Sequence, residues 1–189
     1  MKKFFCCIMA LILSLSVVGC ETTNVQTISE PEEKVFAYGL PEWLLWGMKE
    51  GEVRQHIAHE KILEYGNLIY IVKDDYKKCR VSEYYGFADD NALIHMSYTF
   101  NYSNVIYDEP NPYHDLYNEF KNELIQLYGE PAGEHEEWKD ERYKDDEYML
   151  YKAIEDGDYT ATTAWDLDGF ICYIELNEGL SITYEAKKE

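Results

Sequence analysis

Residues 92–102 carry the pattern that most constrains how this chain folds. Apolar and aromatic side chains alternate there with mostly polar ones along the whole stretch. A period of two is typical of a strand with one buried face and one wet face, as in an antiparallel sheet covered on one side. The side chains expected to face inward are Ala92, Ile94, Met96, Tyr98, Phe100 and Tyr102. We therefore expect a one-sided antiparallel sheet.

The longest predicted helix follows over residues 111–128. Asn111 is expected to cap its first turn and Pro112 to occupy the first helical position, where a missing N–H costs nothing. Gly129 and Pro131 are expected to end it. Its predicted apolar stripe consists of Leu116, Phe120, Leu124 and Leu127. This helix supplies a natural cover for the sheet.

Shorter segments complete the predicted fold. Helices are expected over residues 49–57 and 147–156, and residues 132–146 are expected to be a charged connection. The further predicted strands are residues 68–73, 80–87, 159–165, 170–176 and 180–185. The order predicts the α+β class, an antiparallel sheet with helices packed on one face. It suggests two similar α-β-β-β halves, residues 35–107 and 108–189.

The N-terminus predicts a secretory signal. A basic head, Met1-Lys2-Lys3, precedes an apolar run that is too short to span a bilayer comfortably. The run ends in Val17-Val18-Gly19-Cys20, which resembles the lipobox of bacterial lipoproteins. The resemblance implies that residues 1–19 are removed and that Cys20 carries lipid. Residues 20–34 are polar and are expected to be a flexible tether before a domain over residues 35–189. The expected location is the extracytoplasmic face of a bacterial membrane.

The charge of the chain limits its direct partners. The chain has 37 acidic and 17 basic side chains, and loss of Lys2 and Lys3 would leave 15 basic ones and a net charge of −22. Such a surface repels nucleic acid and anionic lipid, so contact with the membrane is expected only through Cys20. The charge either keeps a tethered domain soluble or favours a cationic protein or cell-envelope partner.

Two cysteines, Cys79 and Cys172, lie beyond Cys20. Outside the cytoplasm they can form one disulfide. The alternative is two separate buried thiols, since Cys172 lies in an apolar strand pattern. The sequence leaves both possibilities open.

One segment has partial calcium-loop spacing. Asp166, Asp168, Gly169 and Glu175 match loop positions 3, 5, 6 and 12, but Ala164 stands where the first carboxylate belongs. The flanking residues alternate as strands, which favours a hairpin turn. Asp166, Asp168 and Glu175 are thus a metal candidate with a structural alternative, and no cofactor is expected.

Motifs for catalysis are not found in the sequence. His56 and His59 are three residues apart with Glu60 outside them, so the zinc-protease spacing is not met and a solvated helix end is expected. No nucleophile elbow, phosphate loop or dinucleotide fingerprint occurs. The four tryptophans, Trp43, Trp46, Trp138 and Trp165, suggest either a stacking platform or packing in the core, and we favour packing. No catalytic residue is assigned, and the chain is not expected to be an enzyme.

Short motifs resemble known lipoprotein families. Trp46-Gly47-Met48 followed by Glu52-Val53 is similar to the opening of uncharacterised bacterial lipoproteins, although Lys49 and Gly51 depart from that pattern. Further similar motifs are Tyr128-Gly129-Glu130-Pro131, Trp165 and Ile182-Thr183-Tyr184. Related motifs occur in SmpA/OmlA-type and β-lactamase-inhibitor-like domains. The resemblance implies a non-catalytic binding or scaffold module of the cell envelope.

Two other functions are kept as alternatives. One is a proteinaceous inhibitor of a secreted cationic enzyme, which the acidic charge favours. The other is an envelope hydrolase that uses a pair of carboxylates, although acids are so numerous here that a pair by itself indicates little.

Overall fold

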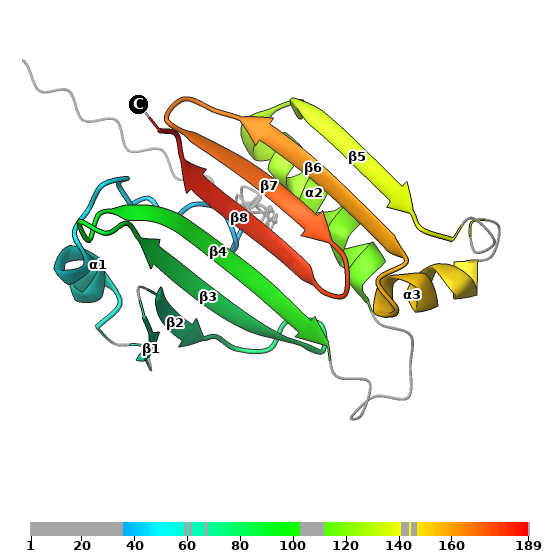
Figure 1. Cartoon of the computed structure of the whole chain (residues 1–189), viewed down its shortest axis with the longest axis horizontal. Helices are drawn as coiled ribbons and strands as arrows, with labels where there is room; N and C mark the ends of the chain where they lie inside the picture. Colours follow the sequence, from blue (N-terminus) through cyan, green and yellow to red (C-terminus); the bar gives the residue numbers. More distant parts are fainter. Residues whose placement is uncertain are drawn as a thin grey trace, which may run out of the picture. The chain divides into compact units, whose positions relative to one another are not determined.

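The fold was analysed in a computed structural model that describes residues 36–58, 60, 62–66, 68–102, 112–140, 144 and 147–188. Within these residues the chain forms one open, eight-stranded antiparallel sheet and three helices (Figure 1). The α+β class is therefore confirmed. The predicted signal at residues 1–19, Cys20 and the tether at residues 20–34 lie outside the described residues.

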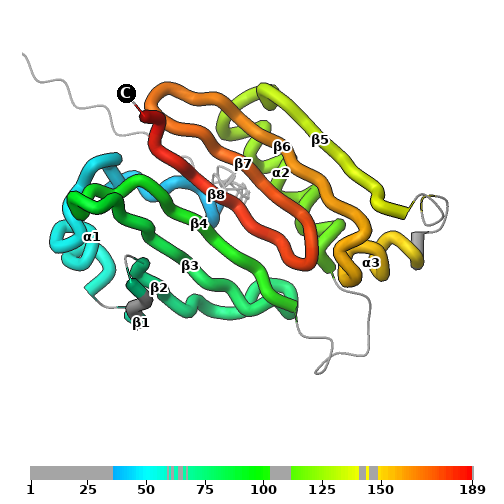
Figure 2. The backbone as a smooth tube through the Cα atoms, viewed as in Figure 1, coloured from blue at the N-terminus to red at the C-terminus, as the bar shows by residue number. Residues whose placement is uncertain are grey.

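Two four-stranded meanders lie side by side in the sheet (Figure 2). The strand order is β1-β2-β3-β4-β8-β7-β6-β5, so the meanders join where β4 pairs with β8. The first consists of β1 (Ile62–Tyr65), β2 (Leu68–Val72), β3 (Cys79–Phe87) and β4 (Leu93–Tyr102). The second consists of β5 (Gly133–Trp138), β6 (Tyr159–Asp166), β7 (Phe170–Leu176) and β8 (Leu180–Ala186). The predicted α-β-β-β pattern is thus wrong in its count, since each half contributes four strands.

The extra strands are the two edges of the sheet. β1 has only four residues, and β5 replaces part of the predicted connection over residues 132–146. The side chains of β5 are mostly exposed and charged, so they show no buried face in the sequence. Pairing with β6 makes this segment a strand.

The alternation in β4 holds over most of the strand. Met96, Tyr98 and Phe100 are buried on the face that forms the core. At the start of the strand the prediction was wrong, because Leu93 is fully buried and Ile94 is 44% exposed. An irregularity in the pairing of β3 with β4 shifts the register there and exchanges the two side chains.

Helix α2 (Tyr113–Tyr128) covers the core face of the second meander (Figure 1). It begins one residue later than predicted: Pro112 is the residue that precedes its first turn, and Asn111 lies outside the described residues. Its buried side chains are Tyr113, Leu116, Tyr117, Phe120 and Leu124. Leu127 was wrongly placed in the apolar stripe and is 52% exposed. Tyr128 packs against Tyr184 instead.

A second helix, α3 (Glu147–Glu155), packs beside α2 and on β6. Ile154 is fully buried as predicted, and Leu150 is partly buried against the core. The second meander therefore has two helices packed on its strands.

The first meander has a thinner cover. Residues 36–48 run across its core face and lead into the seven-residue helix α1 (Glu50–His56). Tyr38 anchors this segment: its ring packs on Phe100, and its carbonyl accepts a hydrogen bond of 2.9 Å from the Tyr184 hydroxyl. Val53 and Ile57 are buried as predicted. One irregular segment and a helix of seven residues lie over this half, and a cavity remains beneath them.

Candidate functional site

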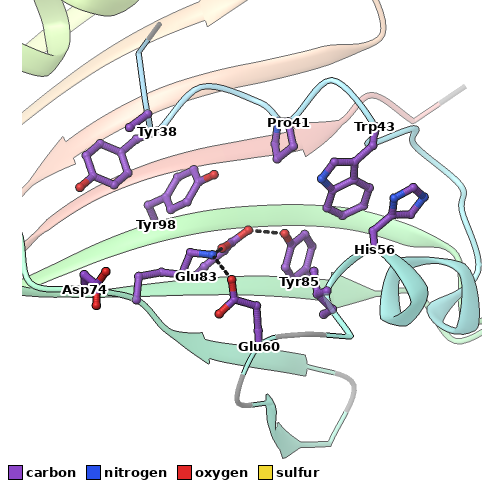
Figure 3. A pocket seen from close by; sticks show the side chains of 12 residues that line it. Tyr38, Pro41, Trp43, His56, Glu60, Asp74, Glu83, Tyr85 and Tyr98 are labelled. Atoms are coloured by element: carbon purple, nitrogen blue, oxygen red, sulfur yellow. Dashed lines mark hydrogen bonds and ion pairs between the residues drawn. The ribbon is translucent and has the colours of Figure 1, made fainter.

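A cavity of about 430 Å³ lies between the thin cover and the core face of the first meander (Figure 3). Residues 37–43 form one wall, the end of α1 forms another, and side chains of β3 and β4 form the floor. This volume is within the range of small-molecule sites in proteins.

Glu83 is the central residue of the cavity. The alternation of β3 places it on the core face together with Val81 and Tyr85, and it is only 4% exposed. Its neighbours across the sheet are Ile71 of β2 and Tyr98 of β4. A carboxylate in such surroundings requires charge-assisted hydrogen bonds to offset its lost hydration.

Two groups supply those bonds. The Tyr85 hydroxyl donates to Glu83 Oε1, and Lys73 Nζ lies 3.1 Å from Glu83 Oε2. Lys73 follows β2 directly, and its ammonium also lies 3.0 Å from Glu60 Oε1 (Figure 3). One ammonium therefore joins two carboxylates that come from different segments of the chain.

The electrostatics of the network keep its groups in defined protonation states. Burial acts to lower the pKa of Lys73, but the hydrogen bonds and charges of Glu60 and Glu83 outweigh it and raise that pKa. Burial, reinforced by the charge and hydrogen bond of Glu83, raises the pKa of Tyr85 far above its usual value. At neutral pH Lys73 is thus a cation, and Tyr85 is a neutral hydrogen-bond donor.

Tyr98 lies beside this network but does not take part in its hydrogen bonds. Its side chain is 5% exposed and lines the cavity, with the hydroxyl pointing into it (Figure 3). No hydrogen bond joins that hydroxyl to any residue that the structure describes. Since every buried polar side-chain atom among the described residues has a partner, the Tyr98 hydroxyl is open to the space of the cavity. Burial, followed by the charge of Glu83, raises the pKa of Tyr98 as well, so it too remains a phenol. The hydroxyl is therefore available to donate or accept a hydrogen bond with a molecule in the cavity.

The rim of the cavity combines an aromatic surface with a carboxylate. The Trp43 indole stacks on the His56 ring with centroids 4.5 Å apart and planes 7° from parallel. Asp74 is exposed on the opposite side of the opening, and it has no ion pair or hydrogen bond within the described part of the chain. The solvated helix end predicted at His56 is therefore one edge of the candidate site, whereas His59 lies outside the described residues.

The calcium-loop candidate is not assembled. Asp166 ends β6 and Asp168 lies in the β6–β7 turn. Asp166 Oδ1 lies 2.6 Å from Lys187 Nζ. Glu175 lies four residues beyond Ile171, the partner of Asp166, which is roughly 13 Å along β7. Within the described residues no group of three or more potential ligands is placed to hold a metal ion. The segment that contains Asp166 and Asp168 is therefore a hairpin turn, which was the structural alternative.

The remaining sequence candidates are structural. Cys79 and Cys172 are separate, buried free thiols, which decides between the two alternatives. Trp165 is 1% exposed and its indole N–H donates to the Gly129 carbonyl at 2.8 Å, as expected for a core residue. Trp46 and Trp138 are partly buried against the core. The tryptophans do not form a common platform, and of the four Trp43 alone lines the described cavity.

Sequence reasoning missed this cavity. One signal was present: in the predicted strand at residues 80–87, Glu83 shares its alternating face with Val81 and Tyr85. An acid on an otherwise apolar face indicates a buried charge with a partner. The partner itself, Lys73, cannot be deduced from the sequence. It comes close to Glu83 only when β2 and β3 pair and the loop between them folds back.

Comparison with models of known protein families, with curated proteins and with solved structures found no match. None of the described helices is long and apolar enough to cross a membrane.

Proposed function

We propose that this chain is a lipid-anchored, extracytoplasmic binding module of the bacterial cell envelope and that its ligand occupies the cavity beneath Trp43. The observation that carries the proposal is the Tyr98 hydroxyl, which points into the cavity from a side chain that is 5% exposed and has no partner among the described residues. A ligand would complete its hydrogen bonding. The basic head, the apolar run and Cys20 support an envelope location.

The state of the charged groups supports binding rather than turnover. Lys73 is held between Glu60 and Glu83, and the neighbouring phenols stay protonated. A nucleophile needs an adjacent base that accepts its proton. Tyr85 donates instead to a carboxylate that is already paired with Lys73, an arrangement that fixes side chains in place.

A ligand screen by thermal unfolding tests this proposal. The full-length chain in detergent would be heated with cationic, neutral and anionic small molecules, in parallel with a Trp43→Ala variant. Saturating ligand at a hundred times its dissociation constant adds about 2.7 kcal/mol, or roughly 5–10 °C, for a domain of this size. We expect such a shift in the wild type and a much smaller one in the variant. If no compound shifts the wild type, the cavity is not a binding site.

The opposite face of the sheet favours a second candidate, an inhibitor of a secreted cationic enzyme. A row of directly paired residues crosses this face, and the helix α2 packs on the other side (Figure 1). The row consists of Tyr70, Tyr84, Ser97, Thr183 and Tyr173. The rings of Tyr70 and Tyr84 stack at 5.0 Å, and such amphipathic side chains are common in protein interfaces.

Lysozyme provides a direct test of this second candidate. Its activity would be measured with excess full-length chain and with a Tyr84→Ala variant. Inhibition that Tyr84→Ala weakens would favour the inhibitor, whereas unchanged lysozyme activity would exclude that enzyme as the target.

A further inference from the structure

The residues around the cavity carry an excess of negative charge. Glu60, Asp74 and Glu83 are acidic, and Lys73 is the single lysine or arginine among the lining residues, which leaves a net charge of −2. Lys73 already lies within 3.1 Å of two carboxylates, so its charge is not free to bind an anionic ligand. The unpaired charge at the opening is Asp74.

The walls of the cavity are aromatic. Trp43, Tyr38 and Tyr98 line it from the covering segment and from β4 (Figure 3). The faces of aromatic rings carry negative electrostatic potential and attract organic cations. The Tyr98 hydroxyl adds an unpartnered oxygen that accepts an N–H bond in the same space.

From this combination of excess carboxylate, aromatic walls and a free phenolic oxygen, we propose that the cavity binds a small organic cation, an ammonium compound with an apolar body. The inference rests on the proposed function of the chain as a binding module. In the complex the apolar body lies against Trp43 and Tyr38. The ammonium group donates to the Tyr98 oxygen and lies in the field of Asp74.

Isothermal titration calorimetry of the full-length chain in detergent tests the charge class with three probes of nearly equal shape. Benzylammonium carries a positive charge, benzyl alcohol is neutral and benzoate is negative. We expect benzylammonium to bind at least tenfold more tightly than benzyl alcohol, and benzoate to give no measurable heat. Added salt should weaken benzylammonium binding, because it screens the attraction to Asp74.

Two conservative variants locate the interaction. Tyr98→Phe keeps the ring and removes the oxygen, and we expect a loss of about tenfold in affinity for benzylammonium. Asp74→Asn should cost about two- to fivefold, since this carboxylate is exposed. Tyr70→Phe and Asp168→Asn make the same chemical changes away from the cavity and should leave the affinity unchanged.

The possible outcomes distinguish a failure of the cation assignment from a failure of the proposed binding function. If benzyl alcohol or benzoate binds as tightly as benzylammonium and Trp43→Ala abolishes that binding, the cavity is a ligand site but the cation assignment is wrong. If benzylammonium binds equally well to the wild type, Tyr98→Phe and Asp74→Asn, the assigned contacts are wrong. If none of the probes binds, and the thermal screen also finds no ligand, both proposals fail.

Discussion

Lys73 Nζ lies 3.1 Å from Glu83 Oε2 and neutralises a carboxylate that is buried on the core face of the sheet. The pair joins the end of β2 to the middle of β3, and Glu60 extends it toward the surface. Since a buried ion pair rarely stabilises a fold more than apolar residues would, its presence in this core is consistent with a role in the cavity.

Removal of Lys73 should destabilise the protein measurably. Lys73→Met leaves Glu83 charged and without its cation, which we expect to lower the free energy of unfolding by about 2 kcal/mol. This is less than for a fully buried pair, because the Lys73 side chain is 35% exposed and Tyr85 still donates to Glu83. Urea denaturation followed by circular dichroism measures the change.

Two further variants isolate the cause of that loss. Lys49→Met removes an exposed pair with Asp90 and should cost far less stability than Lys73→Met. Adding Glu83→Gln to Lys73→Met removes the uncompensated charge and should restore much of the stability. Equal losses for Lys73→Met and Lys49→Met would show that Glu83 does not depend on its cation.

Stability should fall steeply in alkali. Burial is the main reason that the pKa values of Tyr38, Tyr159 and Tyr173 are raised from 10.0 to about 12. Between pH 10 and 12 the unfolded chain releases these protons while the folded chain keeps them, so the free energy of unfolding decreases as pH rises through this window. Below pH 10 both states hold the protons, and this contribution is fully present.

Ultraviolet absorbance of tyrosinate, recorded together with circular dichroism, tests whether stability falls as these tyrosines lose their protons. We expect part of the tyrosine absorbance to appear only in a cooperative step in which the circular dichroism signal is also lost. The chain in concentrated urea should instead titrate in a single phase near pH 10. A single phase in the native protein, with the fold retained, would contradict the raised pKa values.

Much of the fold follows from the sequence, because both the sheet and α2 have one buried side. In β6, buried positions alternate with partly exposed ones, and the apolar residues Ala161 and Trp165 lie four positions apart on the buried face. This alternation makes the strand evident. The edge strand β5 has no such signature, since most of its side chains face water and its partner β6 lies more than twenty residues away in the chain. Pairing at the edge of a sheet depends on tertiary structure, which local periodicity in the sequence does not reveal.

The cavity was unpredictable for a related reason. Tyr98 belongs to the clearest predicted strand, and its position on the core face follows from alternation. That its hydroxyl lacks a partner depends on how closely residues 37–43 cover it, and this segment is neither helix nor strand. The sequence therefore identifies the floor of the site but not the space above it.

The two core thiols should be unreactive in the native protein. Burial is the main cause that raises the pKa of Cys79 and of Cys172 to about 12, so the reactive thiolate is scarce at neutral pH. Iodoacetamide should modify neither residue in the folded chain and both residues in urea, as measured by peptide mass spectrometry. Native labelling of either thiol, or recovery of the two peptides joined by a disulfide, would contradict the structure.

Cys20 should determine whether the chain is bound to the membrane. If the segment Val17-Val18-Gly19-Cys20 is a lipobox, cells given labelled palmitate will label the wild type but not Cys20→Ala. The variant should also leave the membrane fraction, because stable anchoring requires more than one acyl chain and Cys20 would carry them. Cys6→Ala changes a cysteine within the apolar run and should keep both label and location. Retained label in Cys20→Ala, or membrane binding that survives without it, would overturn the anchor and with it the envelope location.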